Sequence, residues 1–120
     1  MDIVDGLVFD DDGGGSVVFN YRTWVEMLCA VICAYAGKSR QESELLVASS
    51  AVVKNAAASH MSVMLCSHEL EYHWAMLIAH GENYWAHGID PTEPDGYVEW
   101  EQAYRKRNGL ADESFIYIDA

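Results

Sequence analysis

The chain has 120 residues and a net charge of −12, from 19 acidic residues against seven Lys or Arg. Its length suits one folded domain, residues 1–120, and its 51% hydrophobic content with four tryptophans and seven tyrosines excludes a disordered chain. Such a charge repels nucleic acid and anionic membranes and speeds encounter with basic surfaces, so we expect no direct binding to nucleic acid or membrane.

The compartment is indicated by the N-terminus, the apolar stretches and the cysteines. The first residues, MDIVDGLVF, are acidic where a secretory signal is basic. The longest strongly apolar stretch, residues 24–36, is too short to span a bilayer. Cys29, Cys33 and Cys66 are odd in number and give no closed set of disulfides. We therefore expect a cytoplasmic protein with three buried thiols.

The first elements are expected to be a β-hairpin and a helix. Residues 3–9 and 16–19 are β-prone runs on either side of DDDGGG, which predicts a hairpin with a long polar turn. Thr23 and Glu26 then have the spacing of a capping box, apolar residues recur at helical intervals, and Gly37 ends the pattern. Few polar residues interrupt any side of this helix, which predicts a central place in the core.

Part of the middle of the chain fits two alternative structures. Ser39 and Glu42 mark a second helix start, and Ala- and Leu-rich sequence continues from residue 44 to about residue 58. Beyond it, residues 69–79 fit a helix, whereas residues 72–89 also fit a hairpin that turns at His80-Gly81-Glu82-Asn83. We favour the helix because Glu, Leu, Ala and Met are frequent in it.

The C-terminal third is expected to contain a loop, a helix and a strand. Two prolines and a glycine predict a loop over residues 90–96, and residues 97–107 form an amphipathic pattern that Asn108-Gly109 ends. The basic residues 105–107 suit the C-terminal end of that helix. Residues 115–118 are a short β-run that could pair with the hairpin. The expected fold is a small single α+β domain, mainly helical.

Two familiar ion-binding patterns are present only in part. Residues 10–15 resemble the start of a calcium loop, but the fifth position is Gly14 and the twelfth is Tyr21, where a bidentate Glu is required. Residues 37–39, Gly-Lys-Ser, end like a phosphate-binding loop, but Ile32 stands where its first glycine is needed. We therefore expect no cofactor at either place.

Histidines suggest one alternative function. His68 and His73 are five residues apart, where a zinc-protease motif needs four. On one helix the series His73, His80, His87 would place neighbours about 10 Å apart, too far for one metal, although His73 and His87 could face each other in a hairpin. The alternative is a small metal-binding or hydrolytic enzyme that uses His68, His73 and His80 with Glu69. No nucleophile motif is present, and no catalytic residue is assigned.

The acidic residues are concentrated in segments that contain no Lys or Arg, mainly residues 2–12, 82–101 and 112–119. Aromatic residues lie beside some of them, and interfaces favour Tyr and Trp as rigid anchors while charge steers the encounter. The candidate partner-binding residues are Asp10, Asp11, Asp12, Glu82, Tyr84, Trp85, Glu93, Asp95, Glu99 and Glu101.

The leading hypothesis is a small cytoplasmic inhibitor that binds a basic, nucleic-acid-acting protein. It would act by occlusion, with carboxylates placed where substrate phosphates would sit, as in a toxin immunity protein or a phage anti-defence protein such as an anti-CRISPR. A third possibility is an adaptor or scaffold subunit whose acidity serves only solubility. The oligomeric state is left open by the sequence.

Overall fold

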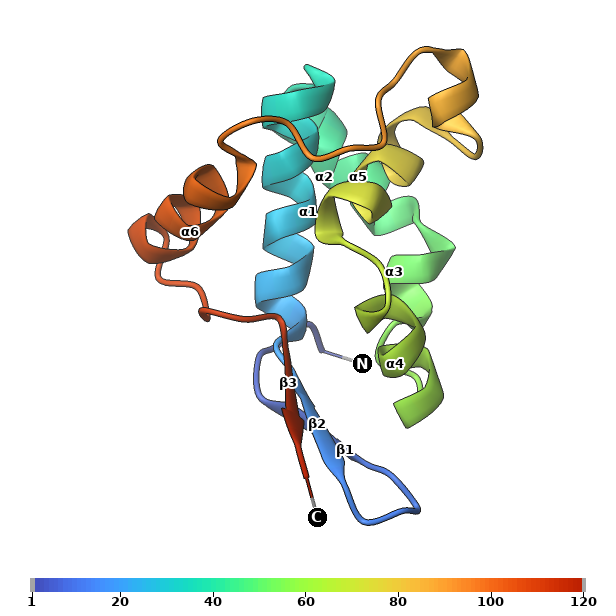
Figure 1. Ribbon diagram of the computed structural model, residues 1–120, viewed down its shortest axis with the longest axis vertical. Helices are drawn as coiled ribbons and strands as arrows, with labels where there is room; N and C mark the ends of the chain where they lie inside the picture. The colour runs from blue at the N-terminus through green and yellow to red at the C-terminus, as the bar shows by residue number, and fades with distance from the viewer. Residues whose placement is uncertain (1, 120) are drawn as a thin grey trace.

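The computed structural model describes residues 2–119. It consists of a helical body with a three-stranded sheet at one end (Figure 1). The elements are β1 (Leu7–Asp10), β2 (Ser16–Phe19), α1 (Tyr21–Ala36), α2 (Arg40–Ser49), α3 (Ala51–Asn55), α4 (His60–Ser67), α5 (Glu71–His80), the 3-10 helix η1 (Tyr84–His87), α6 (Tyr97–Arg107) and β3 (Phe115–Ile118). The predicted α+β fold is confirmed, including the pairing of the N-terminal hairpin with the C-terminal strand.

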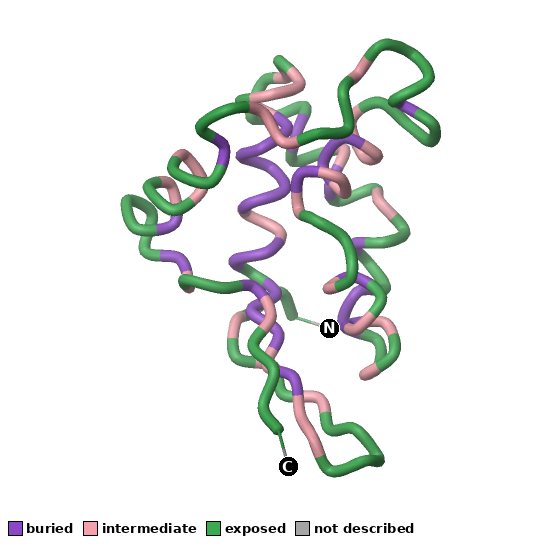
Figure 2. Tube along the Cα trace, viewed as in Figure 1, coloured by how far each residue is buried: buried purple, intermediate pink, exposed green. Residues whose placement is uncertain are grey.

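Helix α1 is the centre of the core. It is buried along most of its length, with Trp24, Met27 and Ile32 wholly inside, and α2, α5 and α6 pack around it (Figure 2). Gly37 ends the helix in the left-handed conformation, with φ of 69°, which glycine adopts without a steric cost. The predicted central helix is therefore confirmed.

The start of α1 differs from the prediction. The helix begins at Tyr21, so Thr23 lies inside the first turn and is not the capping residue. The backbone N–H and the hydroxyl of Thr23 donate to the two carboxylate oxygens of Asp5, each at 2.8 Å. A side chain from the segment before β1 thus accepts the N–H that a local capping side chain would otherwise satisfy.

Local signals set most of the remaining helices. Ser39 forms the predicted capping box with Glu42. The helix expected from Ser39 to about residue 58 is instead two helices, because Ser50 has an extended backbone and its side chain accepts from the N–H of Val53 to begin α3. Residues 71–80 are helical, so the hairpin alternative for this segment is wrong. No helix within residues 2–119 combines the length and the apolar character needed to cross a membrane.

The sheet is antiparallel with β2 in the middle. On its inner face Val17 and Phe19 are buried, and Phe19 stacks on Phe115 with ring centroids 4.9 Å apart. Helix α4 lies against this inner face, where Tyr117 donates a hydrogen bond to Ser67. The inner face therefore joins the sheet to the core of the helical body.

Candidate functional site

The outer face of the sheet is formed by the alternate residues of the three strands. Val8, Val18 and Ile116 form one row across β1, β2 and β3, and Asp10, Ser16 and Ile118 form the next; these six residues are called the outer face below. Val8 is 60% exposed, Ile116 41% and Ile118 49%. The described part of the chain therefore leaves four aliphatic residues in a sheet face without a covering layer.

The tip of the hairpin is an ordered turn that carries exposed carboxylates. The N–H of Asp11 donates to the carbonyl of Gly15 at 2.8 Å, and the N–H of Gly14, which has φ of 99°, donates to the carbonyl of Asp11 at 3.0 Å. Asp10 accepts a hydrogen bond from the Ser16 hydroxyl at 2.8 Å. Within residues 2–119 neither Asp11 nor Asp12 makes an ion pair, so both carboxylates face solvent as predicted.

Acidic residues from both ends of the sequence lie in or beside the sheet. Residues 2–20 and 110–119 contain no Lys or Arg. Their acidic residues are Asp2, Asp5, Asp10, Asp11, Asp12, Asp112, Glu113 and Asp119. On the inner side of the tip, Asp11 and Asp119 line a hollow of about 160 Å³ together with His60 of α4. The two segments that form the sheet end thus combine an apolar face with acidic residues, and the exposed Arg22 follows them at the start of α1.

The second predicted acidic region lies at the other end of the molecule. The long axis is 42 Å, and the segment around η1 is at the opposite end of it from the hairpin tip (Figure 1). Glu82, Asp95 and Glu99 are exposed, and Trp85 is half exposed. The sequence therefore placed these carboxylates on the surface correctly, but the structure does not bring them together with Asp10 to Asp12.

Tyr84 was predicted to be on the partner-binding surface and is instead part of the core. Its side chain is wholly buried, and its hydroxyl lies 2.8 Å from Nδ1 of His73. Trp85 also stacks on that imidazole, with ring centroids 6.3 Å apart, and its ring contacts the ring of Tyr84 edge to face. The short η1 helix folds back onto α5, which turns Tyr84 inward and leaves only Trp85 partly exposed.

Glu93 and Glu101 are only half exposed, and Glu101 forms an ion pair within the protein. Burial, and then the negative charge of Glu101, raises the pKa of Glu93 above its ordinary value. Glu101 pairs with Arg105 on the same helix at 3.2 Å. Since an ion pair inside the protein already holds Glu101, its carboxylate is less available to a partner than those at the hairpin tip.

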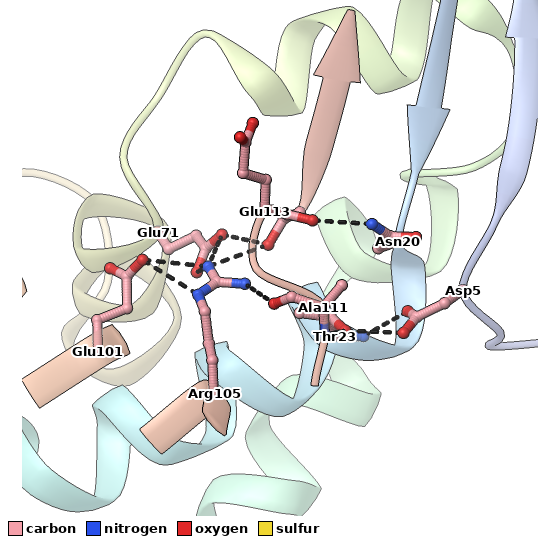
Figure 3. Close-up of polar contacts among 9 residues, drawn as sticks. Asp5, Asn20, Thr23, Glu71, Glu101, Arg105, Ala111 and Glu113 are labelled. Atoms are coloured by element: carbon pink, nitrogen blue, oxygen red, sulfur yellow. Dashed lines mark hydrogen bonds and ion pairs between the residues drawn. The ribbon is translucent and has the colours of Figure 1, made fainter. Parts of the chain in front are cut away.

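Arg105 belongs to a buried cluster that joins three parts of the chain (Figure 3). One guanidinium nitrogen donates to both carboxylate oxygens of Glu71 at 3.0 Å, and another donates to the carbonyl of Ala111 at 3.2 Å. Ser114 donates its hydroxyl proton to Glu71 as well. Burial raises the pKa of the Glu71 carboxyl, and the Arg105 charge opposes this effect.

This cluster was not predicted from the sequence. Residues 105–107 were interpreted as cations at the end of a helix, and Lys106 and Arg107 are indeed exposed at the end of α6. The i,i+4 spacing of Glu101 and Arg105 is the one local sequence signal of this cluster. It indicates the pair of Arg105 with Glu101 but not the pair of Arg105 with Glu71.

The histidines proposed for a metal site lie in three separate settings. His68 is exposed at the end of α4, His80 is exposed at the end of α5, and His73 contacts Tyr84 and lies 4.0 Å from the carboxylate of Glu69. Over residues 2–119, no three side chains among His, Cys, Asp and Glu are arranged so that they could hold a metal ion.

No protein family, curated protein or solved structure matches this chain. The function is therefore inferred from the surfaces described above.

Proposed function

We propose that the protein binds a basic protein through the outer face and the hairpin tip, and that it inhibits this partner by occlusion. The observation that carries the proposal is the uncovered row Val8, Val18 and Ile116 inside a region with eight acidic residues and no Lys or Arg. An immunity protein or an anti-defence protein would act in this way.

The apolar row supports an interface because a solvated sheet face is ordinarily polar. Antiparallel sheets with one buried face alternate apolar residues inside with polar residues outside. Here β1 and β3 carry large apolar residues on both faces, as in the sequence Phe-Ile-Tyr-Ile of β3. A protein interface has the same composition as this surface, with an apolar centre and a polar rim.

The charge of this region supports a basic partner. Asp10 belongs to the outer face, and Asp11 and Asp12 extend from the hairpin beside it. Carboxylates without partners of their own attract Lys and Arg, and they steer a basic protein toward the apolar row. On a nuclease or another nucleic-acid-binding protein, those Lys and Arg residues are the ones that contact phosphates.

The distance between the two acidic regions limits which of them can contact one partner protein. A standard interface buries about 800 Å² on each partner. A patch of that size does not extend from the hairpin tip to η1, at opposite ends of a 42 Å axis. Glu82, Glu93, Asp95, Glu99 and Glu101 therefore contribute long-range steering in this proposal, while Asp10 to Asp12 contribute contacts.

Differential capture from the native host tests the proposal. The wild type, the outer-face variant Val8→Thr/Ile116→Thr and the control Val98→Thr on α6 would each be immobilised at low salt. Threonine keeps the β propensity of the strands while it removes apolar contact area. We expect one basic protein to be retained by the wild type and the control, released by salt, and lost from the outer-face variant.

A basic partner held equally by all three proteins would contradict the proposed surface, and absence of any salt-sensitive partner would contradict the proposed function. The isolated partner then allows the inhibition to be measured. The wild type should displace nucleic acid from it, and the outer-face variant should fail to do so.

A further inference from the structure

A second uncovered apolar surface lies on the helical body, between α2–α3 and α5. Three hollows of about 340, 430 and 190 Å³ follow one another along these helices. The first two share Leu46 and Ser49, and the last two share Val52 and Trp74, so they form one continuous groove. It is called the helix groove below.

The groove exists because α2 and α5 each have two apolar sides. One side of each helix packs toward α1, through Val47 of α2 and through Ala75 and Met76 of α5. The other side carries Leu45 and Leu46 on α2, and Trp74, Leu77 and Ile78 on α5. Leu45 is 63% exposed, and Trp74, Leu77 and Ile78 are only half buried. Neighbouring exposed apolar side chains on a surface helix occur at binding sites.

The succession of the hollows suits one kind of occupant. Leu45 lines the first hollow, Ser49 is shared by the first two, and Val52, beyond the break between α2 and α3 at Ser50, is shared by the last two. An amphipathic helix presents apolar side chains at i, i+3 or i+4, and i+7 on one side, and it binds by placing them in successive hollows of a groove.

We propose that the helix groove binds an amphipathic helix of another protein, with basic residues beside its apolar stripe. The charge follows from the acidic side chains at the groove, Glu42 in the first hollow and Glu82 in the middle one, and from the net charge of −12. Lys38, in the first hollow, is the single Lys or Arg among the described residues that line the three hollows. Glu82 in the middle hollow, together with the net charge of the chain, therefore attracts a basic helix, whereas Lys38 offsets Glu42 in the first hollow and no charged side chain lines the third.

The groove is independent of the outer face. Its residues belong to α2, α3, α4 and α5, whereas the outer face belongs to the three strands, and α4 packs on the opposite side of the sheet. A protein with both surfaces can hold two chains at once, so it can link a helix of one protein to the basic surface of another.

Fluorescence anisotropy with a synthetic peptide tests this proposal. The probe is a labelled helix of about 18 residues, five turns, built from Leu and Lys with leucines at i, i+3, i+4 and i+7. A scrambled peptide of the same composition and a Leu/Glu helix with the same pattern serve as control peptides. We expect the wild type to bind the patterned Leu/Lys helix and neither control peptide.

The matched variants are Val52→Lys in the groove and Val98→Lys on α6. Val52 lines two of the hollows, and Val98 is 53% exposed outside them, so both changes add one charge at an exposed apolar position. Val52→Lys should weaken peptide binding by about tenfold or more, and Val98→Lys by less than about twofold. Leu45→Lys, at a more exposed position, should repeat the loss if Val52→Lys impairs folding in circular dichroism.

Several outcomes would overturn the proposal. Equal losses of peptide affinity in the groove variants and in Val98→Lys would show that net charge alone attracts the peptide. Equal binding of the scrambled peptide would show that binding does not depend on the helical pattern of leucines. Binding of decanoate by the wild type, with no binding of the patterned helix, would assign the groove to a lipid chain beside Lys38. The variant Val8→Thr/Ile116→Thr should bind the peptide normally, which separates this test from that of the outer face.

Discussion

The carboxylates of the helical body and those of the sheet are used differently. In the helical body Glu26, Glu71 and Glu101 each reach an arginine, at 2.6, 3.0 and 3.2 Å. In the described part of the sheet no carboxylate makes an ion pair, and Asp5 alone is held by a buried group, the Thr23 side chain and N–H. The same type of residue therefore contributes to stability in one region, and in the other it remains free to contact a partner.

Helix α1 and the sheet show a parallel difference in how far their apolar residues are covered. Helix α1 is enclosed by the helices around it, whereas the sheet is covered on its inner face only. Free charge and free apolar surface thus occur together at the sheet end. Because stability does not require the two to coincide, the coincidence favours a binding role for this end.

The largest expected effect concerns the buried pair in the helical body. Arg105→Met leaves the Glu71 carboxylate without its cation, which should reduce the free energy of unfolding by about 3–5 kcal/mol. Urea unfolding monitored by circular dichroism measures this loss. The control is Lys106→Met, an exposed neighbour, for which we expect a change within about 0.5 kcal/mol.

Equal stability of Arg105→Met and Lys106→Met would show that the buried carboxylate pairs of the helical body contribute no more to stability than its exposed charges do. The double variant Glu71→Gln/Arg105→Met should recover part of the loss, because it removes the uncompensated charge as well as its partner.

A smaller effect should depend on pH. Hydrogen bonds from Arg40 lower the pKa of Glu26 below its ordinary value of 4.5, with help from the Tyr104 hydroxyl and against the effect of burial. A carboxyl whose pKa is lower in the folded state contributes stability above its unfolded pKa, and this contribution is lost as the pH falls through the folded pKa.

Glu26→Gln should therefore be about 1–2 kcal/mol less stable than the wild type at pH 7, and the difference should disappear at pH values well below 4.5. Thermal unfolding over a pH series measures it. Glu44→Gln, which changes an exposed residue that also pairs with Arg40, is the control and should reduce the stability at pH 7 by less than Glu26→Gln does. A difference that stays constant with pH would exclude the ion pair as its cause.

The smallest effect on stability is expected at the hairpin tip. Asp11→Asn/Asp12→Asn removes two exposed charges without ion pairs, so the free energy of unfolding should change by no more than about 0.5 kcal/mol. The same double variant should slow association with a basic partner, because charge mainly affects the rate of encounter. The control is Asp95→Asn/Glu99→Asn, which makes the same charge change at the other end of the molecule. A large loss of stability in Asp11→Asn/Asp12→Asn would mean that Asp11 and Asp12 have a structural role.

Most of the fold could be predicted because its signals are local. The Ser39–Glu42 spacing, the glycine after α1 and the β-prone runs of β2 and β3 each depend on residues within a few positions of one another. The start of α1 was misjudged because Asp5, 18 residues away, satisfies Thr23. No local pattern indicates such a contact.

The only part of the candidate site that could be predicted is the hairpin tip, because the side chains of a turn are exposed to solvent. Three aspartates followed by three glycines form a turn, and a turn places its side chains in solvent. The environments of Tyr84 and Arg105 depend on partners far along the chain, since Arg105 and Glu71 are 34 residues apart. The outer face was missed because the exposure of Val8 and Ile116 follows from the absence of a covering layer, which the pattern of these strands does not reveal.

The central position of β2 also bears on how the protein reaches its folded state. Asn20, at the end of β2, donates to the carbonyl of Glu113 across 93 residues, whereas the contacts within the α1–α2 pair are much closer in sequence. Closing so long a loop has an entropic cost, and contacts between distant residues slow folding. Helices α1 and α2 can thus pair before β3 docks, and we expect the outer face to be among the last parts of the molecule to be completed.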